Sequence, residues 1–230
     1  MTTNIRVPER YERELAASQD YVGLMGVSVG KADFMNPAIM EQYARFMQEH
    51  FVHSVIVIAD FPKKYNIMAL QGVSEDTAQK RAEMAGNELR TNLERVTRDF
   101  PTVKVARWRH FMNPDYAHNL RVMREGYSQD REFRQSCDEL VMDFLNIPEN
   151  RARWTERTNP PLDVAKEYVL DELALLIAIP RYFRLATCEI YPGRNEVHEK
   201  LQNKKFAFCD DIRLRGDRKF MEAHHEPSSA

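Results

Sequence analysis

Residues 54–60 read Ser-Val-Ile-Val-Ile-Ala-Asp, a continuous apolar run that is rich in β-branched side chains. Runs of this kind are typical of strands buried on both faces, which occur in parallel sheets covered by helices. Residues 21–29 form a second apolar run, which ends at Gly30. We therefore predict two buried strands here and an α/β fold around them.

Helical and strand-like segments alternate through the rest of the chain. Residues 74–100 carry an apolar stripe at helical spacing, which predicts a long amphipathic helix. Further strands are expected at 102–108, 184–191 and 205–208, and further helices at 37–50, 114–124, 130–145, 162–179 and 194–201. This alternation predicts a doubly wound, mainly parallel sheet of about five strands with helices on both faces. Ligands of such sheets bind at the carboxyl ends of the strands, where Ser28 and Tyr191 are expected.

The composition restricts the class of protein. The chain has 230 residues, of which 43% are hydrophobic, and a formal net charge of −2. These values exclude global disorder and predict a single domain over residues 1–230 with a frayed tail at 221–230. The three cysteines contain no Cys-x-x-Cys pair, and the seven histidines show no ligand spacing. We therefore predict a cytoplasmic protein without a metal, a disulfide framework, a targeting segment or a membrane span.

The segment Gly26-Val27-Ser28-Val29-Gly30 is the first that suggests chemistry. It matches G-x-S-x-G, the nucleophile elbow of α/β-hydrolases, in which glycines let a serine project from a tight turn. A hydrolase elbow follows several strands, whereas only 27 residues precede Ser28. A phosphate-binding P-loop is excluded because Ala32 stands where that motif needs Ser or Thr. The alternative is a glycine turn in which the serine has no catalytic role.

Two later segments place tyrosine and carboxylate side chains in apolar surroundings. Tyr168 and Glu172 are four residues apart on an apolar helix, so they share one face, and a buried Glu172 would need a partner. Tyr191 ends a strand before Pro192-Gly193. The alternatives are that the tyrosines pack in the core and that Glu172 lies on an exposed edge.

Four cations lie on or just beyond the polar side of the long helix: Lys80, Arg90, Arg95 and Arg98. With a net charge near zero, a nucleic acid would have to be bound by a local basic patch of this kind. The same helix also carries acidic residues, so a solvated face of mixed charge is the alternative.

Taken together, these motifs resemble those of the cyclodipeptide synthases. That family has a glycine-flanked serine after its first strand, a Tyr-x-x-x-Glu on a later helix and a tyrosine after a late strand. Gly26–Gly30, Tyr168–Glu172 and Tyr191-Pro192 match these motifs in order, and Pro114-Asp115-Tyr116 matches a fourth. The similarity extends from residue 21 to residue 208, and Lys31 with Tyr191-Pro192 places the chain in the Tyr-Pro subgroup.

The resemblance implies a Rossmann-like domain similar to the catalytic domain of class I tyrosyl- and tryptophanyl-tRNA synthetases. The HIGH and KMSKS signatures that those synthetases use with ATP are absent from the sequence. The resemblance further implies that two aminoacyl-tRNAs are the substrates, that no cofactor is needed and that the chain acts as a monomer. The expected product is a cyclic dipeptide, made without ATP because each amino acid arrives as an activated ester.

The resemblance also implies roles for individual residues. Ser28 attacks the first ester and carries the acyl group, while Tyr168 and Glu172 hold the ammonium group of that residue. Tyr191 is expected to relay a proton or bind the intermediate, and Tyr116 to assist positioning. The expected substrate-binding residues are Leu24, Gly26, Asn146, Leu175 and Glu189.

Glu189 suggests a polar first substrate. It lies two residues before Tyr191, so both side chains point to the same face of a strand. A carboxylate in this pocket would favour a basic or hydrogen-bonding side chain, such as that of His, Arg or Lys. The alternative is that Glu189 pairs with Arg184 or Lys200 at the rim of the sheet.

Two other functions fit parts of the sequence. A serine hydrolase or esterase would use Ser28, Asp171 and His198 in that order along the chain. A non-catalytic Rossmann-like RNA-binding module would not depend on Ser28 for any activity.

Overall fold

The computed structural model describes residues 5–154, 161–183, 186–192, 196–213 and 218–225. Five parallel strands form one sheet in the order β4-β3-β2-β5-β6. The strands are β2 Tyr21–Ser28, β3 His53–Ala59, β4 Val103–Arg107, β5 Ala186–Tyr191 and β6 Arg218–Glu222. A separate antiparallel pair joins β1 (Ile5–Arg6) to β7 (His224–His225). The prediction of a Rossmann-like, mainly parallel α/β sheet is confirmed.

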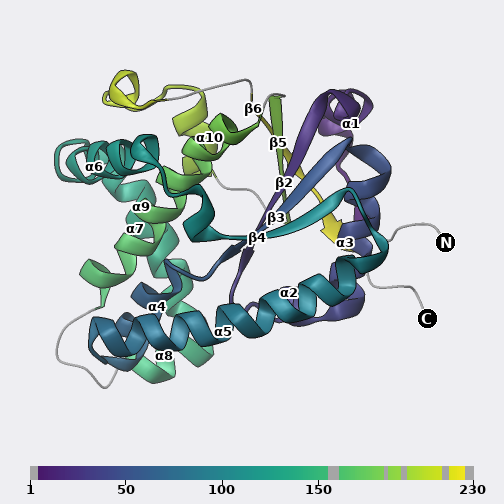
Figure 1. Cartoon of the computed structure of the whole chain (residues 1–230). Coiled ribbons are helices and arrows are strands. Elements are labelled where there is room, and N and C mark those ends of the chain that lie inside the picture. Colours follow the sequence, from purple (N-terminus) through teal and green to yellow (C-terminus); the bar gives the residue numbers. More distant parts are fainter. Residues whose placement is uncertain (1–4, 155–160, 184–185, 193–195, 214–217, 226–230) are drawn as a thin grey trace.

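Helices cover both faces of this sheet. Their bounds are α1 Glu12–Ala16, α2 Ala32–Met35, α3 Pro37–His50, α4 Lys63–Gln71, α5 Glu75–Val96, α6 Pro114–Gln129, α7 Arg131–Asn146, α8 Pro148–Trp154, α9 Leu162–Ala178 and α10 Glu196–Gln202. In Figure 1, α6, α7 and α9 lie to the left of the sheet and α3 lies to its right. The long helix α5 packs against α3, α4, β3 and β4.

The central strand β2 shows why its sequence is apolar at almost every position. Val22 and Leu24 belong to the core cluster that contains the inner faces of α6, α7 and α9. Met25 and Val27 point the other way, into the cluster that contains α3 and α5. Because successive side chains of a strand point to opposite faces, a strand covered on both sides needs apolar residues at both sets of positions.

The helices α3 and α6 begin with the same local device. An asparagine side chain accepts a hydrogen bond from a backbone N–H of the first turn, and a proline occupies the first helical position. The Asn36 oxygen is 3.0 Å from the Ala38 nitrogen, and the Asn113 oxygen is 2.8 Å from the Tyr116 nitrogen. The second cap fixes Tyr116 in the first turn of α6, which packs along α9.

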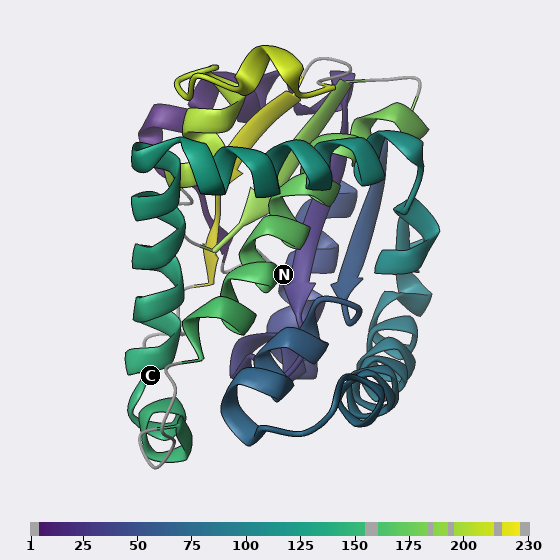
Figure 2. The same cartoon turned by 90° about the vertical axis from the view of Figure 1, so that its left-hand side faces the viewer.

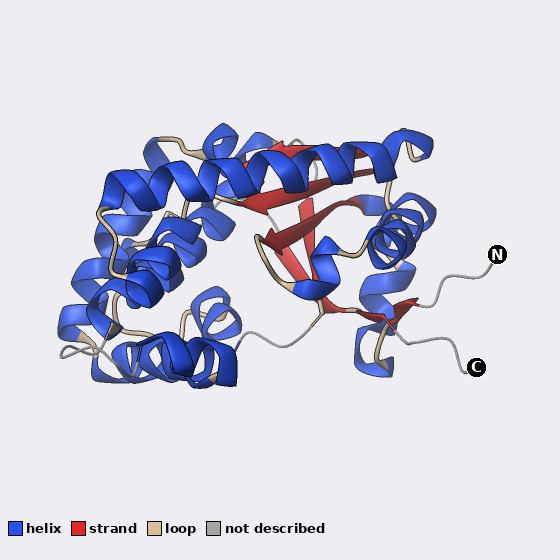
Figure 3. Cartoon of the chain, turned by 90° about the horizontal axis from the view of Figure 1, so that it is seen from below, coloured by secondary structure: helices blue, strands red, loops and turns tan. Residues whose placement is uncertain are grey.

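The direction of the chain reverses across β2. From β2 the chain crosses to β3 on one side of it, and it later returns to β5 on the other side. The crevice of a doubly wound sheet lies at such a point, outside the carboxyl ends of the strands. Figure 2 shows β2 and β3 running toward the end of the molecule where α4 lies, and Figure 3 views that end. The last residues of β2 and β5 there are Ser28 and Tyr191.

One predicted strand is wrong, and several elements were not predicted. Residues 205–208 form a turn rather than a strand, and Phe206 packs its ring against Phe133 at 5.0 Å. The fifth strand is β6, which has a single neighbour in the sheet and therefore does not need a continuous apolar sequence. Residues 221–222 end β6 and residues 224–225 form β7, whereas 226–230 lie outside the described residues. Helices α1, α2, α4 and α8 were not predicted.

Candidate active site

A cavity of about 820 Å³ lies at the carboxyl ends of β2 and β5. Its walls come from the turn after β2, from α4, α7, α8 and α9, and from the end of β5. Ser28, Tyr168, Glu172 and Tyr191 all line this cavity. The structure thus brings together four of the five predicted catalytic residues.

The Ser28 hydroxyl is held by Tyr168. Its Oγ lies 3.2 Å from the Tyr168 hydroxyl, and either group can donate the hydrogen bond. It also interacts with the Tyr191 side chain. Burial and the nearby Glu172 charge raise the pKa of both phenols above the ordinary value of 10. Both tyrosines are therefore neutral at pH 7 and can donate a hydrogen bond to, or accept one from, a reacting oxygen.

Glu172 is a carboxyl group that resists ionisation. Burial is the main cause, the charges of Glu189 and Asp171 add to it, and together they raise its pKa from 4.5 to about 8. Lys31 acts in the opposite direction, because its ammonium group favours the carboxylate. Glu172 is therefore largely protonated at pH 7 in the empty cavity, and a cation that enters would favour its ionised form.

Gly30 lines the cavity, and Gly26 lies on β2 two residues before Ser28. Gly30 has a φ of +87°, a left-handed conformation that side chains other than glycine adopt at a cost. It allows the chain to turn sharply just after Ser28. A Cβ atom at Gly26 would meet no atom within 4 Å, so open space adjoins β2 on the face that also carries Ser28.

Asp171 and Tyr116 lie beneath the cavity, in the core. The carboxylate of Asp171 accepts hydrogen bonds from the Trp108 indole N–H at 3.0 Å and from the Tyr116 hydroxyl at 3.1 Å. Burial raises the pKa of Asp171 to about 6. The structure does not bring Tyr116 to the cavity wall. Instead, the Tyr116 hydroxyl holds Asp171 in place, and Asp171 precedes Glu172 on α9.

Glu189 is buried beside a histidine that we did not expect as its partner. The register pairs Glu189 with Leu24 across the parallel strands, so its side chain shares the Ser28 face of the sheet. One Glu189 carboxylate oxygen lies 3.0 Å from Nδ1 of His198, which is only 1% exposed. The predicted alternative partners differ: Lys200 pairs with Glu132, and Arg184 lies outside the described residues.

None of the five predicted substrate-binding residues, Gly26 and Glu189 included, lines the cavity. Leu24 and Leu175 are buried in the apolar core, and Asn146 is exposed at the end of α7. The predicted tRNA-binding residues Lys80, Arg90, Arg95 and Arg98 are all exposed on α5 or in the turn that follows it. Arg90 pairs with Glu94 at 2.7 Å, so part of that charge is neutralised on the helix itself.

The geometry does not support the hydrolase alternative. A serine hydrolase needs a histidine at the nucleophile and a carboxylate at that histidine. Here Ser28 contacts tyrosines, Asp171 contacts Trp108 and Tyr116, and His198 contacts Glu189. The three residues proposed as a triad are therefore in different environments.

Sequence reasoning missed the polar residues that α4 and α8 contribute to the cavity. Lys63 and Asn66 come from α4, and Glu149, Asn150 and Arg153 come from α8. Both helices are short and carry no apolar stripe that would have predicted them. The one sequence feature that is typical of a helix start at α8 is Pro148, which occupies its first position.

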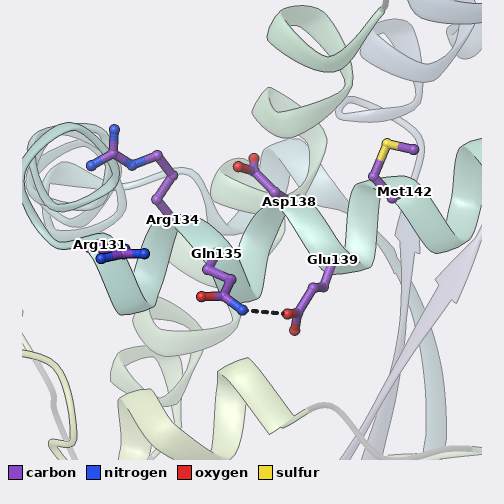
Figure 4. Close-up of a pocket in the computed structure, with 6 residues that line it drawn as sticks. All are labelled: Arg131, Arg134, Gln135, Asp138, Glu139 and Met142. Carbon is purple, nitrogen blue, oxygen red and sulfur yellow. Dashed lines mark hydrogen bonds between the residues drawn. The ribbon is translucent and has the colours of Figure 1, made fainter.

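A second hollow, of about 510 Å³, lies on the outer face of α7 and is shown in Figure 4. It is lined by Arg131, Arg134, Gln135, Asp138, Glu139 and Met142. The Gln135 amide donates to Glu139 at 2.9 Å, and Asp138 accepts a hydrogen bond from Tyr127 at 2.5 Å. It contains no nucleophile, so we assign the chemistry to the cavity at Ser28.

The described residues contain neither a membrane-spanning helix nor a metal-binding cluster. None of their helices has both the length and the apolar composition that a bilayer crossing requires. Their His, Cys, Asp and Glu side chains form no cluster of three or more that would suit a metal ion.

Solved structures resemble this fold closely at low sequence identity. A cyclodipeptide synthase from Fluoribacter dumoffii has a TM-score of 0.78 and 16% identity, covering 97% of this chain and 99% of its own. A Mycobacterium tuberculosis protein, described as showing that cyclodipeptide synthetases are related to type I tRNA synthetases, has a TM-score of 0.73 and 16% identity over 96% and 93% of the chains. The synthase from Candidatus Glomeribacter gigasporarum, solved with Phe-tRNAPhe, has a TM-score of 0.68 and 14% identity over 91% and 89%.

Sequence comparison gives the family directly. No curated protein matches the chain. The family model described as "Cyclodipeptide synthase" matches residues 13–212, which include every residue of the cavity described above. The chain belongs to the cyclodipeptide synthase family.

Proposed function

We propose that this protein joins the amino acids of two aminoacyl-tRNAs into a cyclic dipeptide, with Ser28 as the nucleophile and without ATP. The observation that carries the proposal is the Ser28 hydroxyl, hydrogen-bonded to Tyr168 within a cavity that also contains Glu172. The complex of the Glomeribacter relative with Phe-tRNAPhe supports aminoacyl-tRNA as the substrate class. Tyr191-Pro192 supports membership of the Tyr-Pro subgroup.

The first step is an acyl transfer to Ser28. Its Oγ forms a bond to the ester carbon of the first aminoacyl-tRNA, and the bond from that carbon to the terminal ribose oxygen breaks. The serine proton ends on the ribose oxygen, so the tRNA leaves with its hydroxyl restored. The neutral hydroxyl of Tyr168, which is hydrogen-bonded to Ser28, and that of Tyr191, which lines the same cavity, assist where the proton moves.

The second step must extend the chain while it stays on Ser28. The amine of the bound residue attacks the ester of the second aminoacyl-tRNA, whose ribose oxygen leaves with a proton. If the amine of the second aminoacyl-tRNA instead attacked the Ser28 ester, Ser28 would be released and the dipeptide would remain on the tRNA. The terminal amine of the dipeptide then attacks the Ser28 ester, the ring closes and the serine hydroxyl is restored.

Glu172 suits the handling of the amine. An aminoacyl group brings an ammonium whose ordinary pKa is about 8, and the pKa of Glu172 in the empty cavity is also about 8. Similar pKa values make the ion pair and the neutral pair close in energy, so a proton moves between them at little cost. Glu172 can therefore hold the ammonium and then accept the proton that the attacking amine must lose.

For the first substrate we propose a side chain that forms hydrogen bonds or carries positive charge. The support is the open space at Gly26 and the position of Glu189 on the same face of the sheet, close enough to Glu172 to raise its pKa. His198 is the other polar group at that end. We also propose that the protein acts as a monomer.

The experiment is Ser28→Ala, incubated with a full set of charged tRNAs and analysed by mass spectrometry for cyclic dipeptides. We expect no product from the variant, an unchanged circular dichroism spectrum and no labelled acyl-enzyme. Ser18→Ala is the matched control, because Ser18 lies outside the cavity. A variant that still forms the cyclic dipeptide would remove Ser28 from its role. A protein that binds RNA equally well with and without Ser28 and never forms product would instead be the non-catalytic module.

A further inference from the structure

Lys63, Asn66 and Arg153 form one polar wall of the cavity. Lys63 is the first residue of α4, Asn66 lies one turn later on the same helix, and Arg153 comes from α8. Lys63 and Arg153 are close enough for the positive charge of Arg153 to lower the pKa of Lys63, although burial lowers it more. The wall therefore brings two like charges together.

These groups have no protein partner among the described residues, whereas their neighbours do. Neither cation is within ion-pair distance of a carboxylate there, including the exposed Glu149 on the same wall. The adjacent Lys64 pairs with Glu75 at 2.6 Å. Asn66 is only 8% exposed, and its side chain makes no hydrogen bond to the described protein groups. Lys63 is half-buried, Arg153 is exposed, and the amide of Asn66 faces the open cavity, so all three groups are available to an anion that enters it.

The wall is close to the reacting serine. The Lys63 ammonium would lie 3.4 Å from a Cβ atom at Gly30, and Gly30 follows Ser28 by two residues. The third cation of the cavity, Lys31, is placed differently, because its ammonium lies 5.1 Å from the centre of the Tyr191 ring and is attracted by Glu172. Lys63 and Arg153 thus offer positive charge beside the nucleophile, apart from the groups that hold the amine.

The substrate has an anion at a matching position. An aminoacyl ester has used its α-carboxyl group, so its nearest constant negative charge is the phosphodiester on the 5′ side of the terminal nucleoside. When the ester carbon is at Ser28, that phosphate is one ribose away. Two cations and an amide donor are the groups that bind a phosphate.

We propose that Lys63, Asn66 and Arg153 form a phosphate site for the last phosphodiester of the acceptor strand, and that this site seats the ester at Ser28. The inference rests on aminoacyl-tRNA being the substrate. It assigns the anchoring of the RNA end to the cavity rather than to α5, whose exposed face mixes Lys80 and Arg95 with Glu83 and Glu94. Because every tRNA has this phosphate, the site serves both substrates regardless of the amino acid.

The test measures RNA binding without chemistry. The probe is an uncharged acceptor minihelix that ends in CCA, and its dissociation constant is measured by fluorescence anisotropy at several salt concentrations. A second minihelix carries one neutral methylphosphonate in place of the last phosphodiester. The variants are Lys63→Gln, Arg153→Gln, the double variant and the isosteric Asn66→Asp, and Arg151→Gln is the matched control on α8, exposed and outside the cavity.

We expect the methylphosphonate to weaken binding to the wild type about tenfold, the order of one charge-assisted contact, and to have no further effect on the double variant. The double variant should lower the slope of log affinity against log salt by about 1.4, since each single-strand contact contributes about 0.7. Asn66→Asp should bind as weakly as the double variant, and Arg151→Gln should bind like the wild type.

Equal binding of the two minihelices to the wild type would overturn the proposal. So would a salt slope that Lys63→Gln and Arg153→Gln leave unchanged, or that Arg151→Gln lowers as much. Circular dichroism and thermal melts of each variant identify loss of folding, and the methylphosphonate comparison on the wild type needs no variant. If the protein binds the minihelices as expected but forms no cyclic dipeptide, the phosphate site is supported and the proposed reaction is refuted.

Discussion

The raised pKa of Glu172 makes the stability of this protein depend on pH in a direction opposite to that of most carboxylates. The pKa is 4.5 in the unfolded chain and about 8 in the fold. A group of this kind favours the folded state fully below pH 4.5, and that contribution is lost as the pH rises through 8. Each pKa unit corresponds to about 1.36 kcal/mol. Removing the carboxylate should therefore raise the free energy of unfolding at pH 9 by at most about 5 kcal/mol.

The perturbation is Glu172→Gln, which keeps the shape and cannot ionise. We expect the variant and the wild type to have equal free energies of unfolding at pH 4.5, and the variant to be more stable at pH 9 by several kcal/mol. Urea denaturation followed by circular dichroism at five pH values measures this difference directly. Titrating groups far from Glu172 are common to both proteins and cancel in the comparison.

The control is Asp163→Asn on the first turn of the same helix. Asp163 is exposed, and its hydrogen bond with Lys166 lowers its pKa below 3.8, so it does not titrate between pH 4.5 and 9. The free-energy difference between this variant and the wild type should therefore be independent of pH in that range. If Glu172→Gln gave a pH profile parallel to that of the wild type, Glu172 would be an ordinary ionised carboxylate and its proposed role as a base would fail.

Three further outcomes are expected. Leu173→Ala, next to the cavity carboxyl but fully buried in the core, should cost about 2–5 kcal/mol of unfolding free energy in urea titrations, while purified folded variant retains product formation. Reversing Lys80, Arg95 and Arg98 to Glu should weaken tRNA binding and its salt dependence in anisotropy titrations; binding equal to that of the wild type would exclude α5 as a tRNA contact. Glu189→Leu, offered all charged tRNAs, should shift the first amino acid of the product toward apolar ones by mass spectrometry; an apolar product from both proteins would refute the idea of a polar pocket.

Much of the sheet was predictable because its central strands are apolar on both faces. The runs at 21–29 and 54–60 coincide with β2 and β3 to within a residue at most ends. The edge strand β6 was not predictable by the same rule, since it begins Arg218-Lys219 and has one neighbour. A strand can be recognised from its sequence when both of its faces are buried, because burial requires apolar residues at every position. Strand propensity alone is a weaker signal.

The parts of the site that could be predicted are those in which two functional side chains come from the same helix or strand. Tyr168 and Glu172 share a face of α9 because they are four residues apart, and both line the cavity. The contact of Glu189 with His198 joins a strand to α10, and no local spacing encodes it. The same holds for Lys63 and Arg153, whose helices meet only after the chain has folded. Leu24 and Leu175, by contrast, were expected to bind substrate but are buried in the apolar core.

The pairing of β2 with β5 has a consequence for how the protein is made. Tyr21 pairs with Ala186, which is synthesised 165 residues later. At 5–20 residues per second, one edge of β2 remains without its partner strand for roughly 10–30 s on the ribosome. During that time a row of backbone N–H and C=O groups beside Val22 and Leu24 is open to pairing with other chains. The late arrival of β5 brings Tyr191 to the cavity and closes this edge of β2 at the same time.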